Sequence, residues 1–248
     1  MGIFIKNDSQ VAIMRTACQI CAKTHELLER YIKPGVTTGE LCKIAEEYIR
    51  GQGAKPSFLG YRGFPKAICT SVNEHVIHGV PGLRRLKNGD IISVDIGVCY
   101  KRFHGDAART HGVGVISKAH QRLIDVTKDS FFESMKYARQ GVHLHEMSAA
   151  IEDYVTSRGF SIVDEWCGHG IGRQLHEDPQ VPHHRQEKRG PRLQKGMTLA
   201  VEPMVNAGTH ELNTLDDTWT VITADGKYSA HYENTFLITT GEPDVMTL

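Results

Sequence analysis

Two amphipathic helices are predicted near the start of the chain. Apolar residues recur at intervals of three and four from Met14 to Ile32, and Pro34-Gly35 closes this run. Thr37 and Glu40 have the spacing of a capping box, and a second periodic run ends at Gly51. The first part of the chain is therefore expected to form two helices joined by a short turn.

The same pattern returns 106 residues later. Gly35-Val36 and Glu40-Leu41 have counterparts in Gly141-Val142 and Glu146-Met147, which follow a long helix expected over 123–138. Helices share so many local features that this similarity alone proves little. The strand segments that follow are more informative.

Residues 87–95 and 194–202 share a glycine, four variable positions, a valine and then an acid. The offset between the halves grows further on, which indicates an insertion of about twenty residues between Gly208 and Tyr228. Each half is expected to contain helix, helix and strands.

We therefore predict a single domain over 1–248 of the α+β, or mixed α/β, class. Its halves, about 9–116 and 117–248, are related by a pseudo-twofold axis, with antiparallel hairpins in the middle and helices outside.

Four acids occupy matched positions in these strands. Asp95 and Asp106 lie in an apolar stretch that indicates buried strands, and Glu202 and Glu233 are their counterparts. A hairpin turning near Tyr100-Lys101 would place Asp95 and Asp106 opposite each other, on one face of the sheet. Buried like charges are costly, and we expect no lysine or arginine among them. The four acids therefore predict a metal site.

An alternative gives these acids only local roles. Asp95 could begin a turn at Ile96-Gly97, and Glu202 could end a strand before Pro203. The matched positions of all four favour the metal site. A nitrogen ligand is available in His169, because the flanking Gly168 and Gly170 would let the backbone approach closely.

Composition narrows the class of protein. The formal net charge of 0 argues against a dedicated nucleic-acid binder. No apolar stretch approaches the roughly 20 residues that cross a membrane, and no signal peptide is apparent, so we expect a cytoplasmic protein without a membrane partner. The six cysteines are scattered, which favours reduced thiols, and the single Cys18-x-x-Cys21 is expected to pack in the core.

The candidate ligands resemble those of a known family. Asp95, Asp106, His169, Glu202 and Glu233, with the segments 73–81, 168–173 and 202–208, are similar in order and context to the type I methionine aminopeptidases of metallopeptidase family M24. The resemblance extends from the first helix to the C-terminus. It implies the pita-bread fold around a dinuclear metal site, and a cytoplasmic hydrolase that removes the initiator methionine of nascent proteins when the second residue is small.

The resemblance also implies site roles. Two divalent ions, of Co, Mn, Fe, Zn or Ni, would be held by the five ligands, and a hydroxide shared between them would attack the first peptide carbonyl. Glu202 would be the general base, His176 would stabilise the tetrahedral intermediate, and His78 would contact the scissile amide. The methionine side chain would lie against Tyr61, Phe64, Cys69 and Trp219. Phe58, Phe64 and Leu175 stand where many relatives carry Cys, Tyr and Phe, which bears on the shape of this pocket.

Three other functions remain open at this stage. A related aminopeptidase P or prolidase would act before or after proline, but usually has an additional N-terminal domain, which we do not expect here. A binding protein that has lost catalysis would be expected to have lost ligands, and a structural domain would not retain metal on dialysis. The expected partners are nascent N-termini and, through the basic segment 183–192, the ribosome, with the enzyme a monomer.

Overall fold

Two capped helices begin the fold. The computed structural model describes residues 2–248, so Met1 of the predicted domain lies outside the described residues. Helix α1 (Asp8–Glu29) starts at an Asn7–Gln10 capping box, and α2 (Thr38–Gly51) starts at the predicted Thr37–Glu40 box. The expected continuation of the first helix to Ile32 is wrong, because α1 ends at Glu29.

The first sheet is built on a long hairpin of β4 (Ile91–Tyr100) and β5 (Phe103–Gly112). Its turn is Lys101-Arg102, one residue beyond the predicted position. Asp95 therefore pairs with Ala108, and Asp106 pairs with Gly97. The predicted direct pairing of the two acids is wrong: they are diagonal neighbours, although an offset of two keeps them on one face. Strands β1 (Lys55–Pro56) and β2 (Cys69–Val72) flank β4.

The second half repeats this order of elements. Helices α3 (Lys118–Met135) and α4 (Leu144–Thr156) precede a five-stranded sheet of order β15-β14-β9-β7-β8. Its strands are β7 (Gly168–Gly170), β8 (Glu177–Val181), β9 (Thr198–Val201), β14 (Asn234–Leu237) and β15 (Asp244–Val245). The β9–β14 register pairs Val201 with Asn234, so Glu202 and Glu233 would form the next pair.

Two small sheets complete the structure, together with a 3-10 turn, η1 (Tyr61–Gly63). One joins β6 (Ser161–Ile162), β10 (Met204–Asn206) and β13 (Ser229–His231), and the other joins β3 (His75–Ile77), β11 (Leu212–Thr214) and β12 (Val221–Thr223). The predicted insertion contains the β11–β12 hairpin, which pairs with β3 from the first half.

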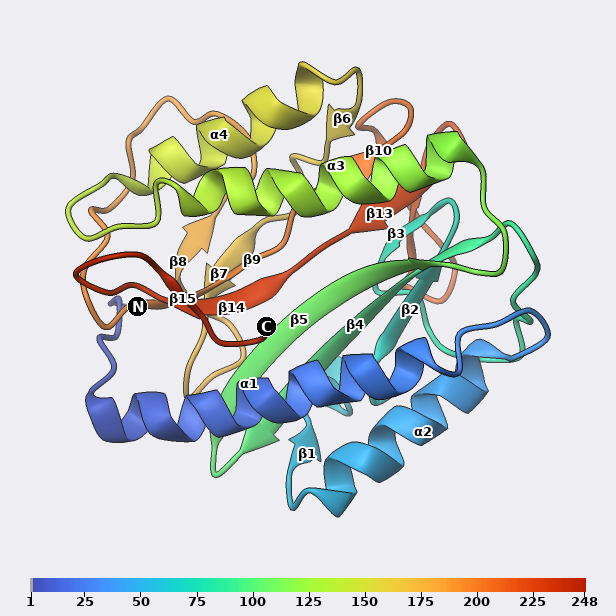
Figure 1. The fold of residues 1–248 in the computed structure, drawn as a ribbon, viewed down its shortest axis with the longest axis horizontal. Helices are drawn as coiled ribbons and strands as arrows, with labels where there is room; N and C mark the ends of the chain where they lie inside the picture. The colour runs from blue at the N-terminus through green and yellow to red at the C-terminus, as the bar shows by residue number, and fades with distance from the viewer. Residues whose placement is uncertain (1) are drawn as a thin grey trace.

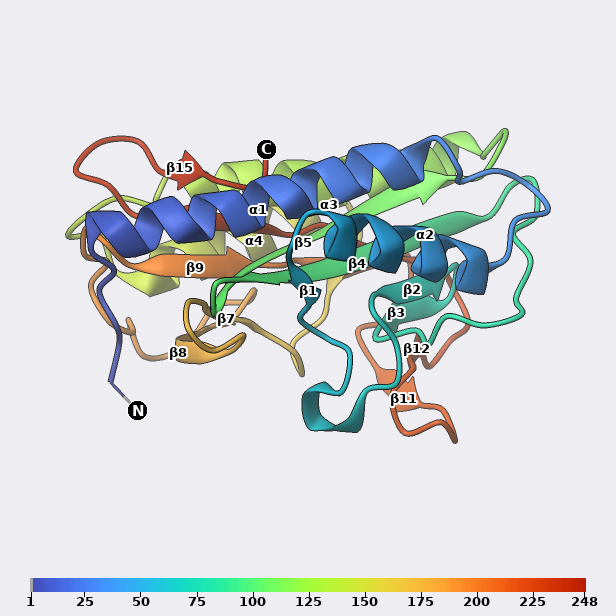
Figure 2. The ribbon, with the colours of Figure 1, turned by 90° about the horizontal axis from the view of Figure 1, so that it is seen from below.

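The two halves meet along β5 and β14, which run side by side through the middle of the molecule (Figure 1). Ala108 and Glu233 exchange backbone hydrogen bonds across this junction, at 3.3 and 3.0 Å. Helices α1 and α3 lie on one side of these strands, and β3, β7, β8, β11 and β12 lie on the other (Figure 2). The junction thus brings acids from both halves together.

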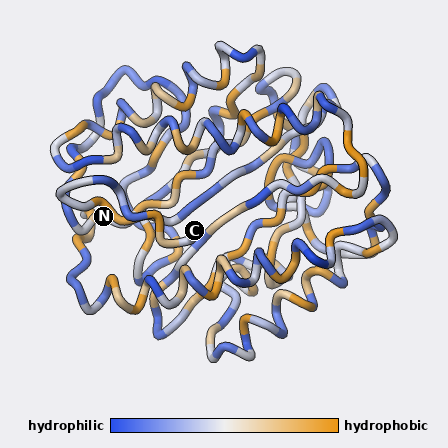
Figure 3. The backbone as a smooth tube through the Cα atoms, viewed as in Figure 1, coloured by the Kyte–Doolittle hydropathy of each residue, from blue (hydrophilic) through white to orange (hydrophobic). Residues whose placement is uncertain are grey.

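The packing agrees with the amphipathic patterns. Along the helices, hydrophobic and hydrophilic residues alternate (Figure 3), and separate apolar clusters lie in each half. Cys18 and Cys21 are fully buried, and all six cysteines are free. The predicted mixed α/β class is confirmed, whereas the reduced thiols and the duplication stay predictions. Among residues 2–248, no helix is both long and apolar enough to span a membrane.

Candidate metal centre

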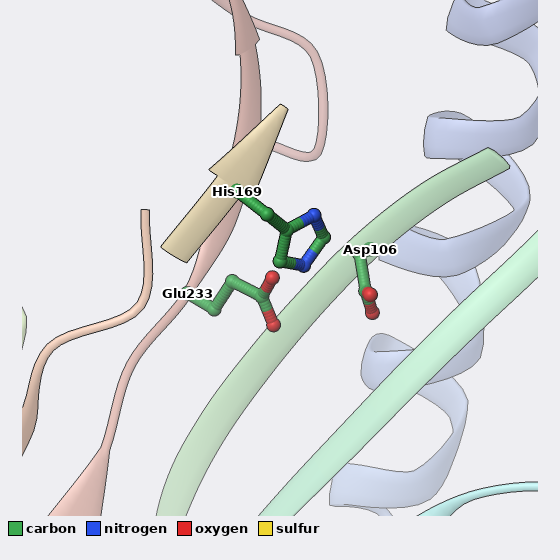
Figure 4. Close-up of side chains that lie close together, drawn as sticks. All are labelled: Asp106, His169 and Glu233. Carbon is green, nitrogen blue, oxygen red and sulfur yellow. The ribbon is translucent and has the colours of Figure 1, made fainter. Parts of the chain in front are cut away.

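Three predicted ligands converge from separate elements. Asp106 lies in β5, His169 in β7, and Glu233 immediately before β14. One ligand atom from each lies within 4.8 Å of the others, all three residues are buried, and their side chains point toward one another (Figure 4). Strand pairing expected from the sequence could suggest only part of this three-residue group.

The other two predicted ligands lie beside this group. Glu202 Oε1 is 3.6 Å from His169 Nε2, and Glu202 Oε2 is 3.7 Å from Nε2 of His231. Asp95 is the diagonal neighbour of Asp106 in the β4–β5 hairpin. Neither Asp95 nor Glu202 belongs to the compact three-residue group itself.

The buried acids perturb one another strongly. Burial, followed by the charges of Asp106 and Glu202, raises the pKa of Asp95 well above its usual value. Burial raises the pKa of Asp106 to about 7, and burial with neighbouring carboxylates also raises the pKa of Glu202 and Glu233. Ionising all four together therefore requires a cation at this place.

The residues present fit a divalent metal. Asp95 Oδ1, Asp106 Oδ1 and Glu233 Oε1 are buried without a hydrogen-bond partner. His169 Nδ1 lies 2.9 Å from the carbonyl oxygen of Gly170; as the donor of that hydrogen bond, Nδ1 carries the proton and leaves the Nε2 lone pair free. Carboxylate oxygens with a single imidazole suit Mn, Fe or Co better than a thiolate-rich site would.

One positive charge does lie among these strands, which corrects the expectation that none would. Arg109 of β5 donates to the backbone carbonyl oxygens of Ala108 and Glu233, and to Oδ1 of Asn234 at 2.6 Å. It lowers the pKa of Glu233, but burial and the neighbouring acids outweigh this effect. Arg109 therefore ties β5 to β14 without neutralising the four carboxyls.

The two predicted catalytic histidines are each held by an aromatic ring. His78 follows β3 at a φ of 58° and meets Trp166 edge-on, with ring centroids 4.9 Å apart. His176 stacks on Tyr61, and its Nδ1 lies 2.8 Å from the Tyr61 hydroxyl. The His176 and His169 centroids are 4.1 Å apart, so His176 borders the ligand group.

The four predicted pocket residues belong to one apolar cluster, which also contains Phe58 and Leu175. Cys69 pairs with Asp95 across β2 and β4, and Phe64 meets Trp219 edge-on with centroids 5.2 Å apart. Tyr61 adjoins His176. The cluster thus contacts the candidate metal centre through Asp95 and through His176.

Sequence reasoning missed several supporting residues. His183 is fully buried, and its Nε2 lies 3.3 Å from Gly168 N and 3.2 Å from Glu202 N. Lys6 and Glu177 form a buried ion pair, in which Nζ lies 2.6 Å from Oε2, and Glu177 directly follows His176 in the sequence. The only sequence signal for His183 is that it stands beside His184 in a histidine-rich region. Nothing in the local sequence indicates the Lys6–Glu177 ion pair.

The chain is similar to known metallopeptidases over nearly its whole length. Residues 12–240 match metallopeptidase family M24. A methionine aminopeptidase of Clostridium perfringens is 52% identical over 246 residues, covering 99% of both chains. The crystal structure of methionine aminopeptidase from Thermotoga maritima superposes with a TM-score of 0.97 at 38% identity, also covering 99% of both chains. A Xaa-Pro dipeptidase from Bacillus anthracis has a TM-score of 0.75 at 25% identity, and the match covers 98% of this chain and 61% of that one.

Proposed function

The chain belongs to the methionine aminopeptidases of metallopeptidase family M24, enzymes that remove N-terminal methionine, and we propose that it acts on nascent proteins whose second residue is small. The observation that supports this most is the convergence of Asp106, His169 and Glu233 from both halves of the fold. Two of the side chains that would contact methionine adjoin the proposed metal centre, because Cys69 pairs with Asp95 and the Tyr61 hydroxyl lies 2.8 Å from His176 Nδ1.

The proposed metal centre uses five residues: Asp95, Asp106, His169, Glu202 and Glu233. Two divalent ions, when bound there, would polarise the scissile carbonyl and lower the pKa of a bound water. The unpartnered carboxylate oxygens of Asp95, Asp106 and Glu233 support this assignment.

We propose that Glu202 accepts the proton of the attacking water. Its carboxyl lies 3.6 Å from the predicted ligand His169, and burial followed by the charge of Asp106 raises its pKa, which makes the carboxylate a stronger base. His176 would donate a hydrogen bond to the developing oxyanion through Nε2, because the Tyr61 hydroxyl faces its Nδ1. His78 would bind the scissile amide from the other side.

The methionine side chain would bind against Tyr61, Phe64, Cys69 and Trp219. Buried Phe64 and Cys69 present an apolar surface, and an unbranched thioether packs well against aromatic edges. Phe58 and Leu175, at 9% and 2% exposure, belong to the same cluster.

We propose one cytoplasmic, monomeric catalytic domain made of two duplicated halves. The matched order of helices and strands and the hydrogen bonds between Ala108 and Glu233 support this organisation. The proposed duplication relates the pair Asp95 and Asp106 to the pair Glu202 and Glu233.

We also propose that the basic segment 183–192 contacts the ribosome. Lys188 and Arg189 are exposed, whereas Arg185 forms an ion pair of 2.7 Å with Asp153. Reversing the charges of Arg185, Lys188 and Arg189 should weaken co-sedimentation with ribosomes. Unchanged co-sedimentation would remove this partner without affecting the enzymatic proposal.

A peptide assay tests the function. The purified protein should release methionine from Met-Ala-Ser when Mn²⁺ or Co²⁺ is supplied, and should lose this activity after chelation. Ala-Pro-Ala is the control, since a proline-directed relative would cleave it. Turnover of Ala-Pro-Ala at the rate of Met-Ala-Ser, or metal-independent turnover, would overturn the proposal.

A further inference from the structure

Two predicted ligands lie where a strand ladder stops. β7 and β9 pair His169 with Ala200 and Gly170 with Leu199, but β9 ends at Val201 before Glu202-Pro203. Gly168 and Glu202 therefore lie outside the β7–β9 ladder, although Gly168 still pairs with Val181 of β8. A buried N–H without an acceptor would be costly, so their partner matters.

A single nitrogen accepts both hydrogen bonds. His183 Nε2 lies 3.3 Å from Gly168 N and 3.2 Å from Glu202 N, and the histidine is fully buried. A nitrogen that accepts two N–H groups cannot carry a proton, so His183 is neutral with its proton on Nδ1. Within the described residues, that Nδ1 has no hydrogen-bond partner.

The backbone at Gly168 lies so close to His183 Nε2 that little space is left for a side chain. A Cβ on Gly168 would lie 3.3 Å from His183 Nε2 and 2.3 Å from the carbonyl oxygen of Ala200. A side chain at position 168 would therefore clash with the β9 backbone, so glycine is required there. His184, the next residue, instead bonds Gln186 through its Nε2, at 2.6 Å.

We propose that His183 is a positioning residue for the metal centre: by accepting the N–H groups of Gly168 and Glu202, it fixes the spacing between ligands His169 and Glu202. His169 directly follows Gly168, and its Nε2 is 3.6 Å from Glu202 Oε1. Without the shared acceptor, the two backbone segments separate and the ligands lose their mutual geometry. This inference rests on the proposed metal centre.

Three variants test it. His183→Leu removes the acceptor, His183→Gln can place its Oε1 near the position of Nε2, and His184→Leu is the matched control beside the site. In metal-free protein, amide hydrogen exchange is measured at Gly168 and Glu202. In parallel, Mn²⁺ affinity is measured by calorimetry.

The leucine variant should exchange both amides at least about tenfold faster and bind Mn²⁺ about 10–100-fold more weakly, the range typical of lost outer hydrogen bonds at metal sites. The glutamine variant should recover most of both properties, and the His184 control should match the wild type. Unchanged exchange, or faster exchange with unchanged Mn²⁺ affinity, would overturn the positioning role.

Two further outcomes are distinguishable. If the leucine variant does not fold, His183→Asn replaces it, because an asparagine oxygen is one carbon too short to reach both amides; equal Mn²⁺ affinity of the asparagine and glutamine variants would overturn the proposal. Absence of Mn²⁺ binding by the wild type would instead overturn the proposed metal centre itself, and with it this role.

Discussion

At the scale of single residues, the carboxyl of Glu202 is proposed to act both as a metal ligand and as the general base. It lies between Nε2 of His169 and Nε2 of His231, at 3.6 and 3.7 Å, and Asp106 and burial raise its pKa. The repeat predicts an acid at this position from the sequence. The contact with His231 could not be predicted, because it depends on the register between β10 and β13.

Replacing Glu202 with glutamine should lower kcat more than it raises KM. The amide keeps the shape of the side chain but cannot take a proton, and general-base catalysis typically contributes about 10²–10⁴-fold in rate. Steady-state kinetics on Met-Ala-Ser would measure the split, with Mn²⁺ content determined on the same samples. A change confined to KM at full metal content would contradict the general-base role.

At the scale of elements, the N-terminal segment is fastened to the loop that carries His176. Lys6 Nζ lies 2.6 Å from Glu177 Oε2, and both side chains are only 4% exposed. Glu177 Oε1 also accepts from Gln174 N at 3.1 Å, and Lys6 N donates to the carbonyl oxygen of Gly196. The ion pair therefore links residues before α1 to the β7–β8 connection.

Replacing Lys6 with methionine should destabilise the protein by about 3–5 kcal/mol, since it leaves the Glu177 carboxylate buried and unpaired. Denaturant unfolding of metal-free protein measures this loss. The double variant Lys6→Met with Glu177→Gln should be more stable than the single one, because no charge is left behind. Equal destabilisation by the single and double variants would contradict the buried-charge explanation.

Some features of the helices and strands could be predicted from the sequence, and others could not. Capping boxes are local, so the start of α2 at Thr37 could be predicted from two residues. The exact position of the β4–β5 turn could not, because Lys101 and Arg102 adopt φ values of 47° and 68° without the glycine or asparagine that usually signals such a turn. A one-residue error in the turn moved the pairing of Asp95 by two residues.

At the scale of the whole molecule, the site is assembled from distant parts of the chain. The Tyr61 contact with His176 spans 115 residues, and the Lys6 contact with Glu177 spans 171. Four of the five proposed ligands were suggested by acids at matched positions in the sequence. The supporting contacts could not be predicted, since they require the halves to be docked along β5 and β14.

This assembly leads to a prediction about the second residue of the substrate. In the proposed scheme His78, packed against Trp166, and His176, bonded to Tyr61, would flank the peptide bonds next to the second residue. Bulk at position two would displace the scissile carbonyl, and a shift of about 1 Å can cost on the order of a hundredfold in rate. Met-Gly, Met-Ala and Met-Ser peptides should be cleaved, whereas Met-Lys and Met-Phe peptides should survive. Comparable kcat/KM for Met-Ala-Ser and Met-Phe-Ser would contradict this selectivity while leaving the proposed metal centre intact, because the ligands do not contact the second side chain in this scheme.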